Sequence, residues 1–217
     1  MAVANRPARG TFESMDAKSH WERVYQTKRP DQVSWYRPHL DVSLELITKT
    51  VSNHDARIID VGGGEATLVD DLLASGYRNV DVLDLSETAL DVARQRLGTS
   101  ATSVGWLRGD VTSYPFEPST YDLWHDRAVF HFLTDPSARS AYVRQVLHAV
   151  KPGGHVIVAT FGPEGPAQCS GLDVVRYDST SLHDQFGERF DLLRHEQEEH
   201  TTPAGRLQQF VYCLCRR

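Results

Sequence analysis

Three consecutive glycines, Gly62, Gly63 and Gly64, follow the short apolar run "RIIDV" and precede a segment with helical spacing. Glycine is favoured where φ must be positive or where another group approaches the backbone closely. A glycine-rich turn after the first strand of a parallel sheet lies at the carboxyl edge, where ligands of such sheets bind. The sequence therefore predicts a ligand-binding turn at these glycines.

Two carboxylates stand at the predicted ends of the next two strands. Asp84 ends the strand in "NVDVLDL", in position to accept hydrogen bonds from ribose hydroxyls. Asp110 follows the third strand in "RGDV", where a carboxylate can accept from an exocyclic amine such as adenine N6. Each acid alone could cap a helix or lie in a solvated turn, but together with Asp60 they favour a ligand that contains adenosine.

Strands and helices alternate along most of the chain. Further strands are predicted in "SVGWLRGDV", "YDLWHDRAV" and "HVIVATF", with a helical segment before or after each, which indicates an α/β fold with a parallel, doubly wound sheet. The C-terminal segments "RFDLLRHEQEEH" and "RLQQFVYCLCRR" predict two strands joined by the short connection "TTPAG". This last pair is expected to be antiparallel.

A dinucleotide-binding fold would share the first acid and is the main alternative. Its G-x-G-x-x-G pattern requires a third glycine at the position that Thr67 occupies. The antiparallel C-terminal pair is also foreign to that architecture. The residues therefore disfavour a nicotinamide cofactor.

The composition of the chain limits the partners and the compartment that we expect for it. The chain has 217 residues, of which 40% are hydrophobic and 24% charged, and a net charge of −6. That charge disfavours nucleic acid as a partner, and no apolar run has the length that a membrane helix needs. No secretory leader is evident, and the three cysteines make neither a disulfide framework nor a metal site. We expect a cytoplasmic protein without a metal.

Five segments carry a resemblance to a known family. In this order and spacing, "IIDVGGGEA", the acid of "VLDLS", "RGDV", "YDLWHDRAVFHFL" and "KPGGHVIVATF" resemble the motifs of class I S-adenosylmethionine-dependent methyltransferases. The resemblance covers residues 40–217 and implies a doubly wound sheet of seven strands in the order 3-2-1-4-5-7-6, with the last strand antiparallel. Residues 1–39 would then form an N-terminal tail and a helical, aromatic cap over the cofactor site.

The resemblance also implies roles for individual residues toward S-adenosyl-L-methionine. Asp60, Gly62 and Gly64 would shape the pocket for the methionine half, and Asp84 would bind the ribose. The adenine would contact three residues: Leu85, Asp110 and the Val111 N–H. Ala66 stands where the family has its third glycine. Glu65 is expected to start a helix whose N-terminal dipole favours the negative end of the ligand.

The acceptor side is expected above the fourth and fifth strands. His125, Asp126, Arg127 and His131 cluster there, beside the expected methyl group. Asp126 and Arg127 could pair with each other, hold the methionine end or take part in catalysis, and His131 is either a packed histidine or a base. His125 is expected on the cofactor side. Cys169 lies in a long insertion at 162–177, where packing is its expected role and contact with a soft acceptor the alternative.

Aromatic residues mark the N-terminal segment. Trp21 and Tyr25 are spaced to share a helical face, and Trp35 and Tyr36 lie just before Pro38. They could be core residues, or they could form a lid over the cofactor, because aromatic faces suit a sulfonium cation. We expect them to contribute to cofactor binding.

Three functions are compatible with these residues. The first is methyl transfer by direct displacement to a small molecule. A thiol or another soft nucleophile (S-methylation) is the first candidate, because it needs little help from a base. The second is methylation of a protein lysine. The third is a regulatory protein that binds S-adenosylmethionine without catalysis, which the intact set of Asp60, Asp84 and Asp110 disfavours.

Overall fold

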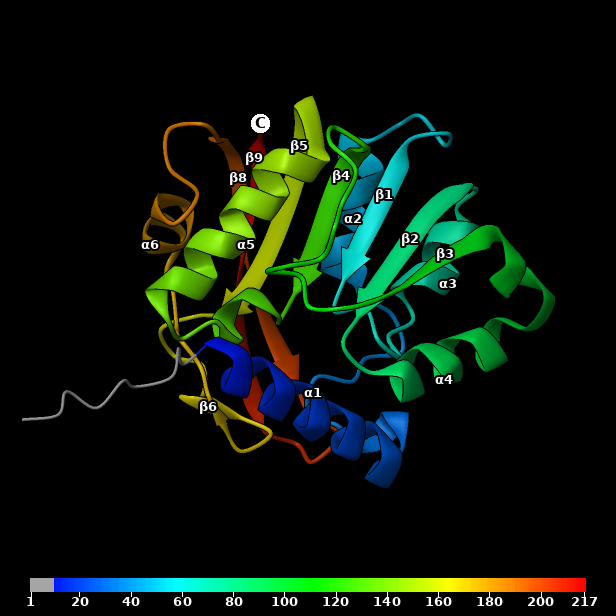
Figure 1. The fold of residues 1–217 in the computed structure, drawn as a ribbon, viewed down its shortest axis with the longest axis vertical. Helices are drawn as coiled ribbons and strands as arrows, with labels where there is room; N and C mark the ends of the chain where they lie inside the picture. Colours follow the sequence, from blue (N-terminus) through cyan, green and yellow to red (C-terminus); the bar gives the residue numbers. More distant parts are fainter. Residues whose placement is uncertain (1–9) are drawn as a thin grey trace, which may run out of the picture.

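A single seven-stranded sheet organises the chain in the computed structural model, which describes residues 10–217 (Figure 1). In spatial order the strands are β3 (Val104–Arg108), β2 (Asn79–Asp84), β1 (Arg57–Val61), β4 (Tyr121–Arg127), β5 (Val150–Phe161), β9 (Leu207–Arg216) and β8 (Asp191–Thr201). The first five are parallel, whereas β9 runs antiparallel to both β5 and β8. The predicted strand order and the antiparallel last strand are confirmed.

Within residues 10–217, six α-helices and three short 3-10 turns accompany the strands. The helices are α1 (Gly10–Thr27), α2 (Asp41–Thr50), α3 (Leu68–Ala74), α4 (Glu87–Leu97), α5 (Pro136–Ala149) and α6 (Ser179–Asp184), and the turns are η1 (Pro30–Gln32), η2 (Gly98–Ser103) and η3 (Phe130–Phe132). The insertion at 162–177 holds a small hairpin of β6 (Gln168–Cys169) and β7 (Leu172–Asp173). Of the helices in residues 10–217, none combines the length and apolar character needed to cross a membrane.

Local signals explain where several helices begin. Ser86 caps α4 by accepting a hydrogen bond from the Ala89 N–H, and Asp135 caps α5 in the same way from Ser137. Pro136 occupies the first position of α5, where a missing N–H leaves no bond unmade. The expectation that Glu65 starts a helix is wrong, because α3 begins at Leu68 after Thr67.

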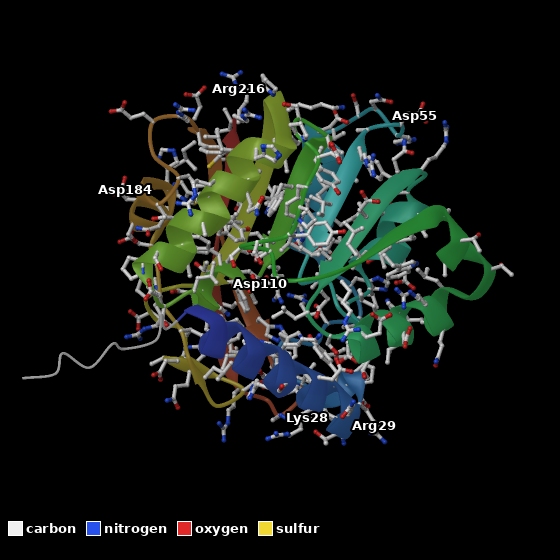
Figure 2. All side chains as sticks on the ribbon, in the orientation of Figure 1. Lys28, Arg29, Asp55, Asp110, Asp184 and Arg216 are labelled. Atoms are coloured by element: carbon white, nitrogen blue, oxygen red, sulfur yellow. The ribbon has the colours of Figure 1, made fainter. Side chains whose placement is uncertain are left out.

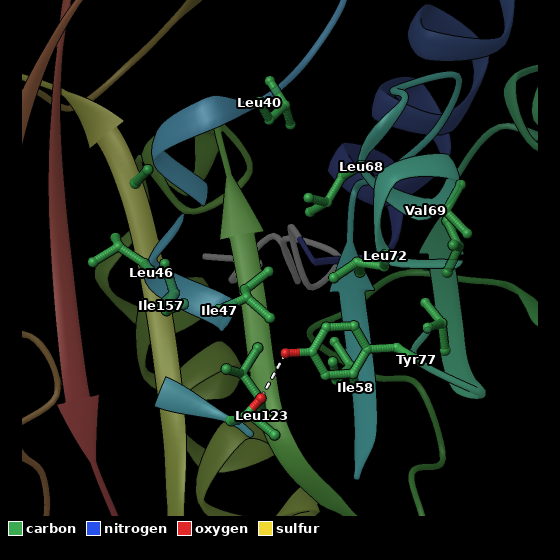
Figure 3. Packing of buried hydrophobic residues seen from close by; sticks show 14 of the residues in the cluster. Leu40, Leu46, Ile47, Ile58, Leu68, Val69, Leu72, Tyr77, Leu123 and Ile157 are labelled. Carbon is green, nitrogen blue, oxygen red and sulfur yellow. Dashed lines mark hydrogen bonds between the residues drawn. The ribbon is translucent and has the colours of Figure 1, made fainter. Parts of the chain in front are cut away.

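Helices cover both faces of the sheet. Alternate residues of each strand point to opposite faces, so that Ile58 belongs to one apolar cluster and Ile59 to the other. The first cluster, part of which Figure 3 shows, packs α2 and α3 on the sheet and contains Tyr77, whose hydroxyl donates to the Val51 carbonyl. The second packs α5 and α6 and contains the fully buried Trp124.

The N-terminal segment crosses the carboxyl edge of the parallel strands. In Figure 1 the arrowheads of β1, β2 and β4 point toward α1 (blue), which lies across that end of the sheet. The Glu22 carboxylate ties α1 to α4 by accepting from the backbone N–H and the hydroxyl of Thr88. Helix α1 therefore lies across this edge, whereas a cap over a cofactor site at residues 1–39 stays a prediction, and residues 1–9 are outside the described part of the chain.

Candidate functional site

A pocket that is partly open to solvent lies between the glycine turn, the N-terminal segment and β4. Its lining comes from three stretches far apart in the sequence. These are Tyr25, Pro30, Val33, Trp35, Tyr36, Arg37 and Leu40; Asp60, Gly62, Gly63, Glu65, Ala66 and Thr67; and His125 and Arg127. Most of the residues expected for the methionine half of a cofactor are thereby brought together.

The glycine turn has no room for side chains. Gly62 and Gly64 have φ of 67° and 46°, in the left-handed region that favours glycine. A Cβ on Gly62 would lie 2.0 Å from Cγ2 of Val129, and one on Gly63 would lie 2.5 Å from Oδ2 of Asp60. The turn therefore brings bare backbone up to the pocket.

A buried chain of hydrogen bonds holds Asp60 in place. The Nδ1 atom of His125 is 2.7 Å from Oδ1 of Asp60, and its Nε2 atom is 2.9 Å from Oγ of Ser43 in α2. All three residues are buried. We expect His125, held by Ser43, to orient the carboxylate of Asp60. Both His125 and Asp60 line the pocket.

Asp84 is a buried carboxylate at the end of β2. Its Oδ1 accepts from the Ser86 N–H at 2.8 Å, and its Oδ2 lies 3.0 Å from the point that a Cβ on Gly64 would occupy. Burial raises the pKa of Asp84 to about 7 against the hydrogen bond from Ser86, and the charge of Asp60 raises it further. Asp84 therefore faces the glycine turn, and its expected contact with the ribose stays a prediction.

The residues expected for the adenine lie beyond this pocket. Asp110 is joined to the end of β2, since the Gly109 N–H donates to the Asp84 carbonyl at 3.0 Å. Its Oδ1 accepts from the N–H and the hydroxyl of Thr112, at 2.9 Å and 2.7 Å. Figure 2 shows Asp110 at the carboxyl ends of the strands, whereas Asp55 and Arg216 lie at the opposite edge. Leu85 and Val111 directly follow Asp84 and Asp110, and their expected adenine contacts stay predictions.

Three of the four expected lid aromatics line the pocket: Tyr25, Trp35 and Tyr36. Tyr25 and Trp35 meet edge to face with ring centroids 6.2 Å apart. Trp21 packs behind them, 5.7 Å from Trp35 and 5.0 Å from Phe132. The aromatic cap is thus one packed unit, with Trp21 as its support.

Arg127 lies under the cap with three buried residues that were not expected from the sequence: Glu198, His200 and Tyr212. We call these four residues the clamp. Only 4% of the Arg127 side chain is exposed, and it donates to the Tyr212 hydroxyl at 2.9 Å and pairs with Glu198 at 3.4 Å. The Tyr212 hydroxyl in turn donates to Glu198 at 2.7 Å. Their charges and polar groups are therefore satisfied by one another.

The clamp holds the segment that carries the lid aromatics. Glu198 forms an ion pair with Arg37. His200 Nε2 lies 2.7 Å from the Ser34 carbonyl, and Arg127 Nη1 lies 3.5 Å from the Trp35 carbonyl. The clamp thus ties the segment that carries Trp35 to β4, β8 and β9.

Two of the three residues expected to be catalytic are held in the core. Asp126 accepts from the backbone N–H groups of Val129 and Phe130 and, at 2.6 Å, from the Tyr142 hydroxyl. His131 accepts from the Phe161 N–H, and burial together with the charge of Arg127 lowers its pKa to about 3. Neither is among the described residues that line the pocket, whereas the third, Arg127, lines it but is engaged in the clamp.

We predict that Trp35→Ala weakens binding of S-adenosylhomocysteine about tenfold, because about 1.4 kcal/mol of aromatic contact is lost. Trp35→Phe keeps an aromatic face and is expected to retain most of the affinity. Isothermal titration calorimetry measures both variants. Equal affinity of Trp35→Ala and wild type would show that the cap does not contact the ligand.

Known proteins resemble the chain in sequence. Residues 58–154 match the family model described as a methyltransferase domain. Malonyl-[acyl-carrier protein] O-methyltransferase of Halalkalibacterium halodurans is 35% identical over 111 residues, which are 49% of this chain and 40% of that protein. The eEF1A lysine and N-terminal methyltransferase of Mus musculus is 24% identical over 139 residues, 64% of this chain and 19% of that protein. The chain therefore spans less than half of the length of either relative.

Solved structures share the fold at low identity. The Burkholderia thailandensis 1,6-didemethyltoxoflavin-N1-methyltransferase, with bound S-adenosylhomocysteine, superposes with a TM-score of 0.68 at 16% identity, covering 100% of this chain and 94% of that one. A structure described for the conversion of a disulfide bond into a thioacetal group during echinomycin biosynthesis gives a TM-score of 0.72 at 18% identity, covering 93% and 92%.

The pocket itself fits S-adenosylmethionine. A turn in which Cβ atoms would collide leaves backbone free to approach the ligand, a buried carboxylate of Asp84 faces that turn, and aromatic rings of Tyr25 and Trp35 suit a sulfonium cation. Residues 58–154 of this chain match a methyltransferase domain, and the strand order is the one that the resemblance to class I S-adenosylmethionine-dependent methyltransferases implies.

Proposed function

We propose that the protein transfers a methyl group from S-adenosylmethionine to a small molecule, with a thiol or another soft nucleophile as the first candidate. When bound, the cofactor supplies an electrophilic methyl group. The chain's own residues would bind and orient it: the glycine turn and Asp60 at the methionine half, and Asp84 at the ribose. The capped pocket carries this proposal, because direct displacement needs alignment of the reactants and exclusion of water.

The burial and hydrogen bonding of Asp126 and His131, the two candidate bases, support a soft acceptor. Asp126 accepts three hydrogen bonds, and His131 is buried with a lowered pKa, so both are held in structural roles. A thiol needs less help from a base than a hydroxyl or an ammonium group, since a few per cent of it is already thiolate at neutral pH.

Methylation of a protein lysine is the second candidate. The similarity to the eEF1A lysine and N-terminal methyltransferase, which extends over 64% of this chain, favours it. A lysine acceptor would have to lose its proton before transfer and would enter the pocket past the aromatic cap.

Methyl-labelled S-adenosylmethionine distinguishes these candidates. The protein is incubated with the label and with separate pools of small thiols, phenols, amines and proteins, and heat-denatured protein serves as the control. We expect label in the thiol pool. Label that enters only protein would contradict the small-molecule proposal, and label in phenols alone would contradict the soft acceptor.

A further inference from the structure

Glu65 is a buried acid for which the sequence predicted no contact between its side chain and a ligand. Its side chain follows the glycine turn and lines the pocket, and 6% of the residue is exposed. Within the described residues, neither of its carboxylate oxygens has a hydrogen-bond partner. A buried carboxylate left in this state is costly for the fold, so an unpaired one at a pocket points to a ligand that would pair with it.

The backbone of Glu65 is anchored while its side chain is free. Arg96 donates to the Glu65 carbonyl at 2.6 Å and to the Ala66 carbonyl at 2.7 Å. The guanidinium is otherwise paired with Asp70 at 2.7 Å, so its hydrogen bonds do not go to the Glu65 carboxylate. The turn is thereby fixed in a position that keeps this carboxylate at the pocket.

Asp84 and Tyr25 both lie close to the residue that precedes Glu65. A Cβ on Gly64, the residue before Glu65, would lie 3.0 Å from Oδ2 of Asp84 and 3.1 Å from the Tyr25 hydroxyl. Burial raises the pKa of Glu65, and the charge of Asp84 raises it further. Burial likewise raises the pKa of Tyr25, and the charges of Asp84 and Glu65 add to that shift. Two carboxylates therefore lie next to one another beside a turn of bare backbone.

We propose that Glu65 is a second cofactor-binding carboxylate, which accepts a hydrogen bond from the ribose hydroxyls of S-adenosylmethionine beside Asp84. This inference rests on the proposed function, because it presumes that the pocket binds that cofactor. A vicinal diol offers two donors, and two ionised carboxylates offer the acceptors that it needs.

Cofactor binding should then release protons. Burial raises the pKa of Glu65 to about 7 although Arg96 opposes it, and burial also raises that of Asp84 to about 7. The groups that face this pair from the neighbouring elements are Tyr25 and Glu22 of α1, Asp60 of β1 and Arg96 of α4. Hydroxyl donors favour the ionised form of both acids, so affinity is expected to rise as the pH rises through 7.

Calorimetry of Glu65→Gln tests the inference. The matched control is Glu45→Gln, which makes the same substitution at an exposed residue of α2 that is paired with Lys49. The ligands are S-adenosylhomocysteine and 5′-methylthioadenosine, which keeps the ribose but lacks the amino-acid end. At pH 8 we expect Glu65→Gln to lose about tenfold in affinity for both ligands, as for one charged hydrogen bond. Glu45→Gln should bind both as wild type does.

Two further readouts separate binding from folding. The ligand-free Glu65→Gln protein should melt a few degrees higher than wild type at pH 8, since it no longer buries an unpaired charge. Wild-type titrations in buffers of different ionisation enthalpy should show proton release near pH 7 that falls in Glu65→Gln.

The contradicting results are distinct. Unchanged affinity of Glu65→Gln for both ligands would overturn the inference while the proposed function stands. A loss for S-adenosylhomocysteine alone would place Glu65 at the methionine end and overturn the ribose contact. Failure of folded wild type to bind either ligand would overturn the proposed function, and this inference with it.

Discussion

Glu198→Ala is expected to lower the free energy of unfolding by about 3–5 kcal/mol, because it leaves the buried guanidinium of Arg127 without its counter-charge. Only 4% of the Arg127 side chain and 5% of the Glu198 side chain are exposed, so water cannot replace the lost partner. The ion pair between Glu198 and Arg37 is lost as well, which loosens the segment that carries Trp35 and Tyr36. Urea denaturation measures the first effect, and a weaker affinity for S-adenosylhomocysteine reports the second.

Glu199→Ala is the matched control, since Glu199 is the next residue of β8 and is exposed. Its free energy of unfolding should stay close to that of wild type. Glu198→Gln keeps the shape and the hydrogen-bond acceptor and should cost less than the alanine variant. Equal stability of Glu198→Ala and Glu199→Ala would show that the clamp does not hold the cap.

The advantage of wild type over Glu198→Ala should depend on pH. Burial alone would raise the pKa of Glu198, but the charges of Arg127 and Arg37 and the hydrogen bond from Tyr212 lower it below its ordinary value of 4.5. A carboxyl whose pKa is lowered by folding stabilises the protein above that ordinary value, and the stabilisation is lost as the pH falls through the lowered pKa. The difference between the two proteins should therefore shrink below pH 4.5.

Gly62→Ala is expected to lower the free energy of unfolding and to abolish most cofactor binding. An L side chain at φ 67° costs roughly 1–2 kcal/mol. The new Cβ would also lie 2.0 Å from Cγ2 of Val129, and relieving such an overlap costs about 1–3 kcal/mol. Either the turn, which lines the pocket, or the segment after β4 must move.

A double-mutant cycle separates these two costs. Gly153 also has a positive φ, 77°, and nothing lies within 4 Å of a Cβ placed on it, so Gly153→Ala should show the conformational cost alone and leave cofactor binding intact. Val129→Ala removes the colliding methyl group and should restore part of the stability when combined with Gly62→Ala. Additive effects of Gly62→Ala and Val129→Ala would mean that the two residues do not collide.

Much of the fold could be predicted from the sequence because its signals are local. The apolar runs, the capping residues Ser86 and Asp135, and the short hairpin connection each specify an element without reference to distant residues. The glycine turn and Asp84 were predictable for the same reason, since each directly ends or follows a strand. The start of α3 was not, because Glu65 has the composition of a first helical turn but lies in the turn before Leu68.

The clamp could not be predicted because its contacts are remote in sequence. Arg37 and Glu198 are 161 residues apart, and Ser34 and His200 are 166 apart. In the sequence, Glu198 is one of several acids on an alternating strand, and nothing local distinguishes it from Glu196 or Glu199. Strand alternation turns Glu198 to the face opposite Glu199, and only its buried contacts with Arg127 and Arg37 distinguish it from Glu196.

Asp126 and His131, at and after the end of β4, were predicted as site residues but lie in the core. Asp126 and His131 have the side chains that a catalytic pair would need, and only their environment assigns them to the core. Hydrogen bonds from Tyr142 and from two backbone N–H groups occupy Asp126. Residue type and spacing predict the chemistry that a group could do, whereas burial and partners decide whether the group is free to do it.

Calorimetric titration of the wild-type protein tests most directly whether this pocket binds an adenosyl cofactor. Protein shown by its absorbance to be free of nucleotide, and by its cooperative melting to be folded, is titrated with S-adenosylmethionine and with S-adenosylhomocysteine. We predict saturable heat from one site per chain with both ligands, and a higher melting temperature in their presence. No heat from either ligand, with no change in melting temperature, would contradict the assignment of the pocket.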